Sequence, residues 1–383
     1  MKILILNEGF EKQGHIEKRC AVSVSSVKRM VKRGITVVVQ QGAGALSGYP
    51  DEAFIEAGGT VQQNCDADLQ DADILLCVNR PDESVYTLLK AQALVIGHID
   101  PFFQKQAVEA MAKRRLTTLS VEMIPRSSRA QKMDALSSQA SLAGYVMVMQ
   151  AANHLPSILP MMMTPSGTIK PAKVFIIGAG VAGLQAIATA KRLGANVTAY
   201  DTRDVVAEQV ESLGGKFLKI DIGETGQTKD GYAKELTDEQ KQKQQDAQRD
   251  AIADSDIVIT TAQLFGRRPP QLISKETLAL MRPGSVVMDM AATSGGNVEG
   301  SVPGQVATVN GVTVIGYGNW SQFVAKDATD MYANNLYNLL DEFYDDESAQ
   351  FTLNMDDEIL AGCVITHDGE ITNGMLKQAY QGV

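Results

Sequence analysis

The sequence contains few of the residues that most often bind metals or form disulfides. It has only four histidines, and its four cysteines are scattered without a C-x-x-C pair, at Cys20, Cys65, Cys77 and Cys363. This distribution indicates neither a zinc site nor a disulfide framework. It is typical of a reducing compartment, so we expect a cytoplasmic protein without a metal centre.

Long hydrophobic runs and basic clusters are missing as well. The longest mainly apolar stretch, residues 142–163, is interrupted by Gln150, Asn153, His154 and two prolines, which argues against a membrane-spanning helix. The apolar start, residues 1–6, is too short for a signal peptide. The formal net charge is −10 and no basic block occurs, which disfavours nucleic acid and anionic lipid as partners. We therefore expect no nucleic-acid partner and no direct membrane insertion.

The most informative stretch of the chain lies between residues 173 and 203. An all-apolar run at its start is typical of a parallel strand that is buried on both faces. Gly178, Gly180 and Gly183 follow this run as G-x-G-x-x-G. Gly178 would allow the tight turn, Gly180 the close approach of a pyrophosphate, and Gly183 the packing of the helix against the strand. The pattern predicts the dinucleotide-binding turn of a Rossmann domain.

The residues after the glycine turn favour NAD(H) over NADP(H). The helix N-terminus at Val181 and Ala182 would direct free N–H groups at the phosphates. Asp201 ends the second strand of the motif, where a carboxylate would accept hydrogen bonds from the adenosine ribose and repel a 2′-phosphate. Arg203 could instead pair with a 2′-phosphate, so both residues belong to the candidate cofactor site.

Strand and helix patterns alternate along the whole chain, which predicts an α/β fold. The pattern Asp-x-Asp-Ile before a buried strand occurs at residues 71–74 and again at 254–257, so the two halves share one plan. With 383 residues, 44% of them hydrophobic, the chain can bury two cores. We predict two Rossmann-like, doubly wound domains with mainly parallel sheets. The first is discontinuous, residues 1–135 and 322–383, and the second, residues 136–321, binds NAD(H).

Two long helical patterns, near residues 133–155 and 328–343, would join these domains. Residues 161–172 form an irregular approach to the glycine turn. Near the C-terminus, residues 351–354 and 359–366 have the composition of strands and would return to the first domain.

A loop and helix start at residues 125–145 is not predicted by any generic fold. It reads Pro-Arg-Ser-Ser-Arg-Ala-Gln-Lys-Met-Asp-Ala-Leu-Ser-Ser-Gln-Ala-Ser-Leu-Ala-Gly-Tyr. This segment closely resembles the NAD(H)-binding component, the soluble alpha-subunit domain, of proton-translocating nicotinamide nucleotide transhydrogenase. The likeness extends over nearly the whole chain, and further segments that carry it are residues 178–190, 208–216, 231–235, 283–290, 295–297 and 362–369.

The resemblance assigns roles to particular side chains. In the transhydrogenase family this segment sits over the nicotinamide ring. The resemblance therefore implies a role for four side chains during hydride transfer. They would position the nicotinamide carboxamide, its ribose and the facing cofactor, and they are Arg126, Gln131, Asp134 and Ser137. The resemblance also implies that the polar segment before the Gly-Tyr pair is a mobile loop that closes on bound nucleotide, with Tyr232 as its contact residue.

The same resemblance implies partners and a location. NAD(H) would be bound by this chain and NADP(H) by a partner subunit, and hydride would pass directly between them. A membrane-spanning subunit would couple this transfer to proton translocation. The chain would be active only with these partners, would form a homodimer, and would lie at the cytoplasmic face of the inner membrane through its partner subunits.

Two other functions remain open from the sequence. Alanine dehydrogenases resemble the same scaffold, and Arg19 and His98 match their pattern. Reductive amination needs a general acid/base, yet the dehydrogenase lysine and aspartate positions here hold Cys77 and Thr293. Hydride transfer between two nicotinamides moves no proton and needs no such set. A non-catalytic NAD-responsive binding module is the third possibility.

Overall fold

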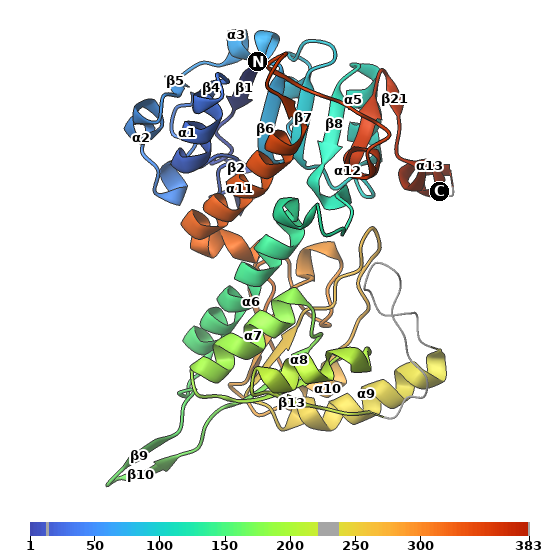
Figure 1. Cartoon of the computed structure of the whole chain (residues 1–383). Coiled ribbons are helices and arrows are strands. Elements are labelled where there is room, and N and C mark those ends of the chain that lie inside the picture. Colours follow the sequence, from blue (N-terminus) through green and yellow to red (C-terminus); the bar gives the residue numbers. More distant parts are fainter. Residues whose placement is uncertain (13–14, 221–236, 382–383) are drawn as a thin grey trace. The chain divides into compact units, whose positions relative to one another are not determined.

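The computed structural model describes residues 1–12, 15–220 and 237–381, and the chain divides into two compact units (Figure 1). Unit 1 consists of Met1–Gln139 and Gln322–Val383, and unit 2 of Ala140–Ser321. The first change of unit lies within the long helix α6, Ala135–His154, and the second lies in the short 3-10 helix η6, Trp320–Val324. The other long helix, α11, Ala325–Phe343, therefore belongs to unit 1.

Unit 1 is built on one eight-stranded sheet with the order β21-β20-β8-β7-β6-β1-β4-β5. From β8 to β5 neighbouring strands are parallel, whereas β20 is antiparallel to β8. Helix α1 packs against β4 and α11, and α5 packs against β8, β20 and β21. The strands are β1 Lys2–Ile5, β4 Thr36–Gln40, β5 Thr60–Gln62, β6 Ile74–Asn79, β7 Leu94–His98, β8 Thr117–Ser120, β20 Val364–His367 and β21 Glu370–Ile371. The helices are α1 Val24–Lys32, α2 Asp51–Glu56, α3 Asp66–Asp71, α4 Glu83–Tyr86, α5 Lys105–Lys113, α12 Glu358–Cys363 and α13 Gly374–Gln381.

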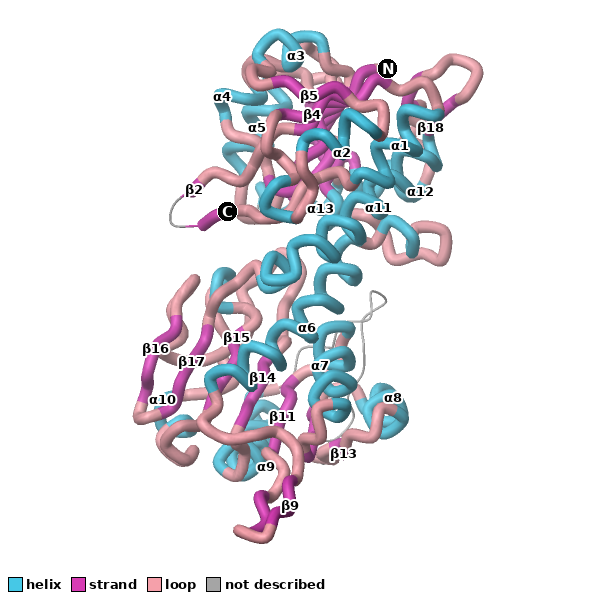
Figure 2. Tube along the Cα trace, turned by 90° about the vertical axis from the view of Figure 1, so that its left-hand side faces the viewer, coloured by secondary structure: helices cyan, strands magenta, loops and turns pink. Residues whose placement is uncertain are grey.

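Unit 2 is built on a seven-stranded sheet with the order β13-β12-β11-β14-β15-β17-β16, and most of these strands lie side by side in Figure 2. All neighbours are parallel except β16, which is antiparallel to β17. The strands are β11 Lys173–Ile177, β12 Asn196–Tyr200, β13 Lys216–Phe217, β14 Ile257–Thr260, β15 Val286–Asp289, β16 Val306–Val309 and β17 Val312–Ile315. The helices are α7 Val181–Arg192, α8 Ala207–Ser212, α9 Asp238–Ala253 and α10 Lys275–Leu278. The prediction of two mainly parallel α/β folds is confirmed.

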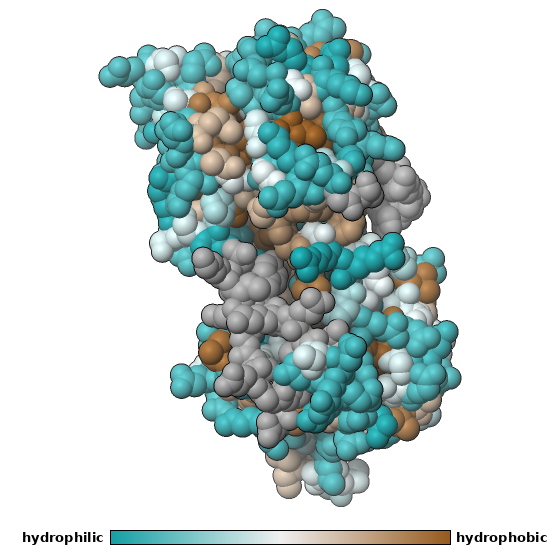
Figure 3. All heavy atoms as spheres, turned by 90° about the vertical axis from the view of Figure 1, so that its right-hand side faces the viewer, coloured by the Kyte–Doolittle hydropathy of each residue, from teal (hydrophilic) through white to brown (hydrophobic). Residues whose placement is uncertain are grey.

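The central strands are apolar because helices cover both of their faces, as expected for a parallel sheet. Ile3, Phe175 and Val287, for example, are almost completely buried. The face shown in Figure 3 carries mostly hydrophilic side chains with small hydrophobic patches. Among the residues that the structure describes, no helix is long and apolar enough to cross a membrane.

Three local predictions are wrong. Residues 359–366 are not one strand, because Asp357 accepts a hydrogen bond from the N–H of Ile359 at 2.9 Å and so starts helix α12 before the short strand β20. Residues 351–354 are not one strand, since β19, Gln350–Phe351, ends at Phe351 and pairs with β18, Tyr344–Asp345, in a short hairpin of unit 1. Residues 161–172 contain a hairpin, β9 Met162–Thr164 and β10 Gly167–Ile169.

Candidate functional site

The strand order of the unit 2 sheet reverses at β11. The next strands along the chain, β12 and β13, lie on one side of β11, whereas β14 and β15 lie on the other. In open α/β sheets, ligands bind outside the carboxyl ends of the strands at such a switch point. The glycine turn follows β11 directly at this edge. Thr261, which follows β14, donates its hydroxyl to the carbonyl oxygen of Gly178 at 3.1 Å and ties the two strand ends together.

Each glycine of the turn has a different environment. Gly178 has a φ of +101°, and a Cβ there would lie 2.4 Å from Oγ1 of Thr261. A Cβ on Gly183 would lie 1.9 Å from the carbonyl oxygen of Gly178, so helix and strand meet backbone to backbone. A Cβ on Gly180 would meet nothing within 4 Å among the residues that the structure describes. The turn is therefore crowded at two glycines and open at the third, which is the arrangement that a pyrophosphate against the backbone requires.

Helix α7 begins directly after this open glycine. Gly180 is its N-cap and provides no side-chain hydrogen bond, so the first N–H groups keep the capacity to bind an anion. Val181 is 46% exposed, whereas Ala182 is buried. The backbone of Ala182 lies against Gly144 of α6, which was not identified from the sequence. A Cβ on Gly144 would lie 2.1 Å from the Ala182 carbonyl oxygen. Gly144 thus allows close contact between α6 and α7.

The acidic residue of the motif is already hydrogen-bonded within the protein. Oδ2 of Asp201 accepts the N–H of Ala179 at 2.8 Å and Nη2 of Arg203 at 2.9 Å. Oδ1 accepts the backbone N–H and Nε of Arg203, both at 2.9 Å. The hydrogen bond to Asp201 raises the pKa of Arg203. Asp201 therefore both anchors the glycine turn and holds Arg203 in a bidentate ion pair.

A second buried carboxylate orders the neighbouring loops and was missed in the sequence. Asp289, at the end of β15, is fully buried and accepts the backbone N–H groups of Ala291, Asn297 and Val298 at 3.0–3.2 Å. The side-chain amide of Asn297 donates to the carbonyl oxygens of Ala262 and Pro270 at 3.0 and 2.8 Å. Together they fix the loops that follow β14 and β15. An Asp six residues before Gly-Gly-Asn was the signal available in the sequence.

The side chains predicted to act in hydride transfer lie in unit 1, at and before the start of α6. Asp134 precedes the helix, and its carboxylate accepts the N–H of Ser137 at 2.8 Å and also the Ser137 hydroxyl. Asp134 therefore acts as the N-cap of α6. Gln131 lies in the 3-10 helix η3, Gln131–Met133, and is exposed, as is Arg126. Gln131, Asp134 and Ser137 lie within two turns of backbone, whereas Arg126 stands at the other end of the loop.

Helix α11 holds this loop in place. Asn335 and Asn338 both donate their side-chain amides to the carbonyl oxygen of Lys132, at 3.0 and 2.9 Å. Glu342 pairs with the Lys132 ammonium at 2.6 Å. The three α11 residues share one helix face, because they are three and four positions apart. That polar stripe is a signal in the sequence which could have identified them as supporting residues.

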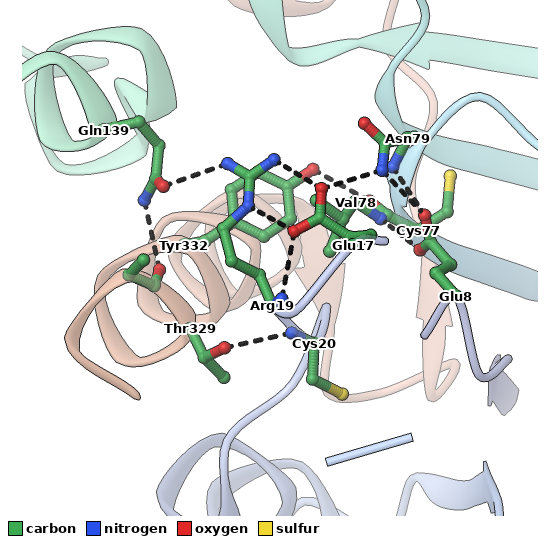
Figure 4. A network of polar contacts seen from close by, with 11 residues as sticks. Glu8, Glu17, Arg19, Cys20, Cys77, Val78, Asn79, Gln139, Thr329 and Tyr332 are labelled. Atoms are coloured by element: carbon green, nitrogen blue, oxygen red, sulfur yellow. Dashed lines mark hydrogen bonds and ion pairs between the residues drawn. The ribbon is translucent and has the colours of Figure 1, made fainter. Parts of the chain in front are cut away.

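A buried polar network occupies the carboxyl edge of the unit 1 sheet, around β1 and β6 (Figure 4). Glu17 accepts Nε and Nη2 of Arg19, each at 2.8 Å, and Nη1 of Arg19 donates to Gln139 at 3.0 Å. The side-chain amide of Asn79 bridges Glu17 at 2.9 Å and Glu8 at 3.2 Å. Arg19 is thus bonded to protein acceptors on three of its nitrogens.

The two carboxylates of this network differ in acidity. Burial raises the pKa of Glu8 to about 7, although N–H donors from Val78 and Asn79 lower it. Burial would also raise the pKa of Glu17, but the charge of Arg19 and its hydrogen bonds hold that pKa at about 2. At neutral pH, Glu17 is therefore the fixed counter-ion of Arg19, whereas Glu8 is partly protonated.

Three further positions distinguish or connect this chain and the alanine dehydrogenases. Cys77 and His98 lie in unit 1, and Thr293 lies in unit 2. Burial raises the pKa of the Cys77 thiol well above its usual value, so this residue stays protonated. His98 lies 3.6 Å from Glu122, measured from Nδ1 to Oε1, and stacks on the ring of Tyr332 with 5.3 Å between centroids. Thr293, in unit 2, packs where a Cβ on Gly318 would lie 2.4 Å from its methyl group. Neither Cys77 nor Thr293 provides an amine or a carboxylate.

Two predictions concern features beyond these side chains. Tyr232 and the polar segment around it, residues 221–234, lie outside the described residues. Within the part of the chain that the structure describes, no group of three or more His, Cys, Asp or Glu residues is arranged to hold a metal ion.

Comparison with known proteins identifies the family. The model of the alanine dehydrogenase/PNT N-terminal domain matches residues 6–143, and that of the C-terminal domain matches residues 147–374. The chain belongs to the alanine dehydrogenase/PNT family. It is 42% identical over 369 residues to an NAD(P) transhydrogenase alpha-subunit chain of Rhodospirillum rubrum, and the match covers 94% of this chain and 96% of that protein.

A solved structure agrees with this result. The transhydrogenase of Sinorhizobium meliloti superposes with a TM-score of 0.86 at 42% identity, covering 97% of this chain and all of that one. The alanine dehydrogenase of Mycolicibacterium smegmatis is 27% identical over 290 residues, 75% of this chain and 72% of that enzyme. The predicted resemblance to the transhydrogenase alpha subunit is therefore confirmed. The family consists of NAD-binding oxidoreductases.

Proposed function

We propose that the chain binds NAD(H) at the glycine turn of unit 2 and passes hydride directly to or from NADP(H) held on a partner subunit. The observation that carries this proposal is the turn itself, with crowded glycines at Gly178 and Gly183 and an open face at Gly180. The likeness to transhydrogenase alpha subunits supports the choice of reaction.

The residues of unit 2 fit a dinucleotide. The uncapped N-terminus of α7 would receive the pyrophosphate, because its N–H groups and helix dipole favour an anion. Asp201 stands at the end of β12, where the adenosine ribose is recognised in Rossmann domains. The bound nicotinamide supplies the hydride chemistry, and the protein supplies position and electrostatics.

Unit 1 would orient the nicotinamide. Asp134 and Ser137 are fixed by capping α6, and the loop with Gln131 is fastened to α11 through Lys132. Hydrogen bonds that hold the loop in one position favour direct hydride transfer, because the two nicotinamide carbons that react must approach to roughly 3–3.5 Å. Arg126, at the start of the loop, would contact either the nicotinamide bound to this chain or the NADP(H) held on the partner subunit.

The partner subunits follow from this proposal. A second, NADP(H)-binding subunit must present its nicotinamide to this chain, and a membrane-spanning subunit would couple the transfer to proton movement. The chain would then lie at the cytoplasmic face of the inner membrane through these subunits. The name of the Rhodospirillum rubrum relative describes it as one portion of an alpha subunit, which supports an assembly of several chains.

The alternative is an alanine dehydrogenase, which the matching residues Arg19 and His98 favour. The Arg19 guanidinium is bonded to Glu17 and Gln139, so an oxo-acid carboxylate would have to displace one of them. Cys77 stands at the position of the dehydrogenase lysine. We expect no oxidation of NADH by the isolated chain when pyruvate and ammonia are supplied, as followed by NADH absorbance. Steady turnover under these conditions would favour the dehydrogenase.

We also propose that the chain forms a homodimer through the β9–β10 hairpin. This hairpin extends away from the sheet of unit 2 (Figure 1), and among the described strands β9 and β10 pair with each other alone. Met161 and Met163 are 61% and 72% exposed, and an isolated hairpin is only marginally stable. A second copy would cover these methionines.

The hairpin proposal predicts a change of mass in solution. The double variant Met161→Ser, Met163→Ser should shift a dimer toward monomer in light scattering, because it removes apolar contact area. Met331→Ser, an exposed methionine of α11, is the matched control and should leave the mass unchanged. A monomeric wild-type chain, or a hairpin variant as dimeric as the wild type, would contradict the proposal.

A further inference from the structure

Nucleotide selectivity at the end of β12 depends on more than the acidic residue. A carboxylate offers about four lone-pair directions. Asp201 receives four N–H groups from the described residues, one from Ala179 and three from Arg203, all at 2.8–2.9 Å. A ribose hydroxyl that binds Asp201 must therefore displace one of these donors.

The donors are not equally easy to displace. The N–H groups of Ala179 and Arg203 belong to the backbone, and the first of them fixes the glycine turn. The guanidinium of Arg203 is a side-chain group, and its side chain keeps 17% of its exposure, against 7% for Asp201. It is the donor that can leave without any movement of the turn.

The ion pair also changes the charge that a 2′-phosphate meets. An isolated Asp201 would repel the phosphate, but Arg203 neutralises it through two hydrogen bonds of fork geometry. A guanidinium that has left Asp201 could itself bind the phosphate. Arg203 therefore acts against the discrimination that Asp201 alone would provide.

We propose that Arg203 is a specificity-determining residue, because it competes with the adenosine ribose for Asp201 and offers a cation to a 2′-phosphate. The proposal rests on the proposed NAD(H) site in unit 2. Under it, the preference of the wild-type chain for NAD(H) is set by the Asp201–Arg203 pair rather than by Asp201 alone. Asp201→Ala is a poor test of ribose recognition, because it also removes the acceptor of the Ala179 N–H and so disturbs the glycine turn.

The test is calorimetric titration of the full chain with NADH and with NADPH. Arg203→Met keeps the length of the side chain and the backbone N–H but removes the guanidinium. NADH affinity should rise about two- to tenfold, the equivalent of one net hydrogen bond, and NADPH affinity should fall by a similar factor. Arg203→Lys keeps the charge without the fork and should give an intermediate ratio of affinities.

The matched control is Arg192→Met, which removes the same charge from the exposed far end of α7. An NADH-to-NADPH ratio that stays constant or falls in Arg203→Met, or a weaker affinity for NADH, would overturn the proposal. An equal rise in the Arg192→Met protein would overturn it too, because the effect would then be general electrostatics. If the wild-type chain binds neither nucleotide, the proposed NAD(H) site fails instead, and the two failures are distinguishable.

Discussion

Replacing Gly180 by alanine is expected to weaken NADH binding by about tenfold to a hundredfold, the loss of one charge-assisted hydrogen bond to the pyrophosphate. The added methyl group would meet no atom of the described residues within 4 Å, and it would enter the space that the pyrophosphate would use. Because alanine is a poorer N-cap than glycine, the free energy of unfolding should fall by about 1 kcal/mol at most. Calorimetry with NADH and urea unfolding would measure the two quantities.

Two further glycine variants separate binding from folding. Gly183→Ala should lower the free energy of unfolding by about 1–3 kcal/mol, because its methyl group would lie 1.9 Å from the Gly178 carbonyl oxygen. Gly374→Ala, at the first residue of α13, also meets no atom of the described residues within 4 Å and should change neither quantity. Unaltered NADH affinity in a folded Gly180→Ala protein would mean that the pyrophosphate lies elsewhere.

The second large effect should appear in the rate of hydride transfer. Asp134→Asn keeps the N-cap of α6, since asparagine caps as well as aspartate does, but removes the negative charge. Gln131→Asn shortens an exposed side chain at the start of η3. Each change should slow transfer by about tenfold to a hundredfold, because small errors of position cost that much, while NADH affinity changes little.

Gln209→Asn on α8 is the control for the shortened amide, since it makes the same exposed change in unit 2. Its transfer rate should equal that of the wild type. The measurement is single-turnover kinetics with the chain saturated with nucleotide, combined with calorimetric affinities. Equal losses of rate and affinity would show that Asp134 and Gln131 bind the nucleotide uniformly rather than position it.

The glycine turn could be predicted from the sequence because its requirements are local. The tight turn at Gly178 and the contact of Gly183 with the Gly178 carbonyl oxygen both arise within six residues. The start of α6 is local as well, since Asp134 and Ser137 are three positions apart. The alternation of strands and helices identified the fold class for the same reason.

The parts that failed or were missed depend on contacts between distant segments or on a single cap. Residues 359–366 contain enough apolar residues for a strand, but the side chain of Asp357 starts a helix there. The fastening of Lys132 by Asn335 and Asn338 joins residues some 200 positions apart. The number of donors on Asp201 could not be predicted either, because the motif gives the residue and not its partners.

The central claim is direct hydride transfer to a nucleotide on a second protein, and stopped-flow mixing tests it most directly. The chain loaded with an NADH analogue would be mixed with the NADP(H)-binding domain of a family member loaded with NADP⁺. We expect a rapid single turnover in the mixture and no redox change with either protein alone. Absence of transfer when calorimetry shows that both nucleotides are bound would contradict the account.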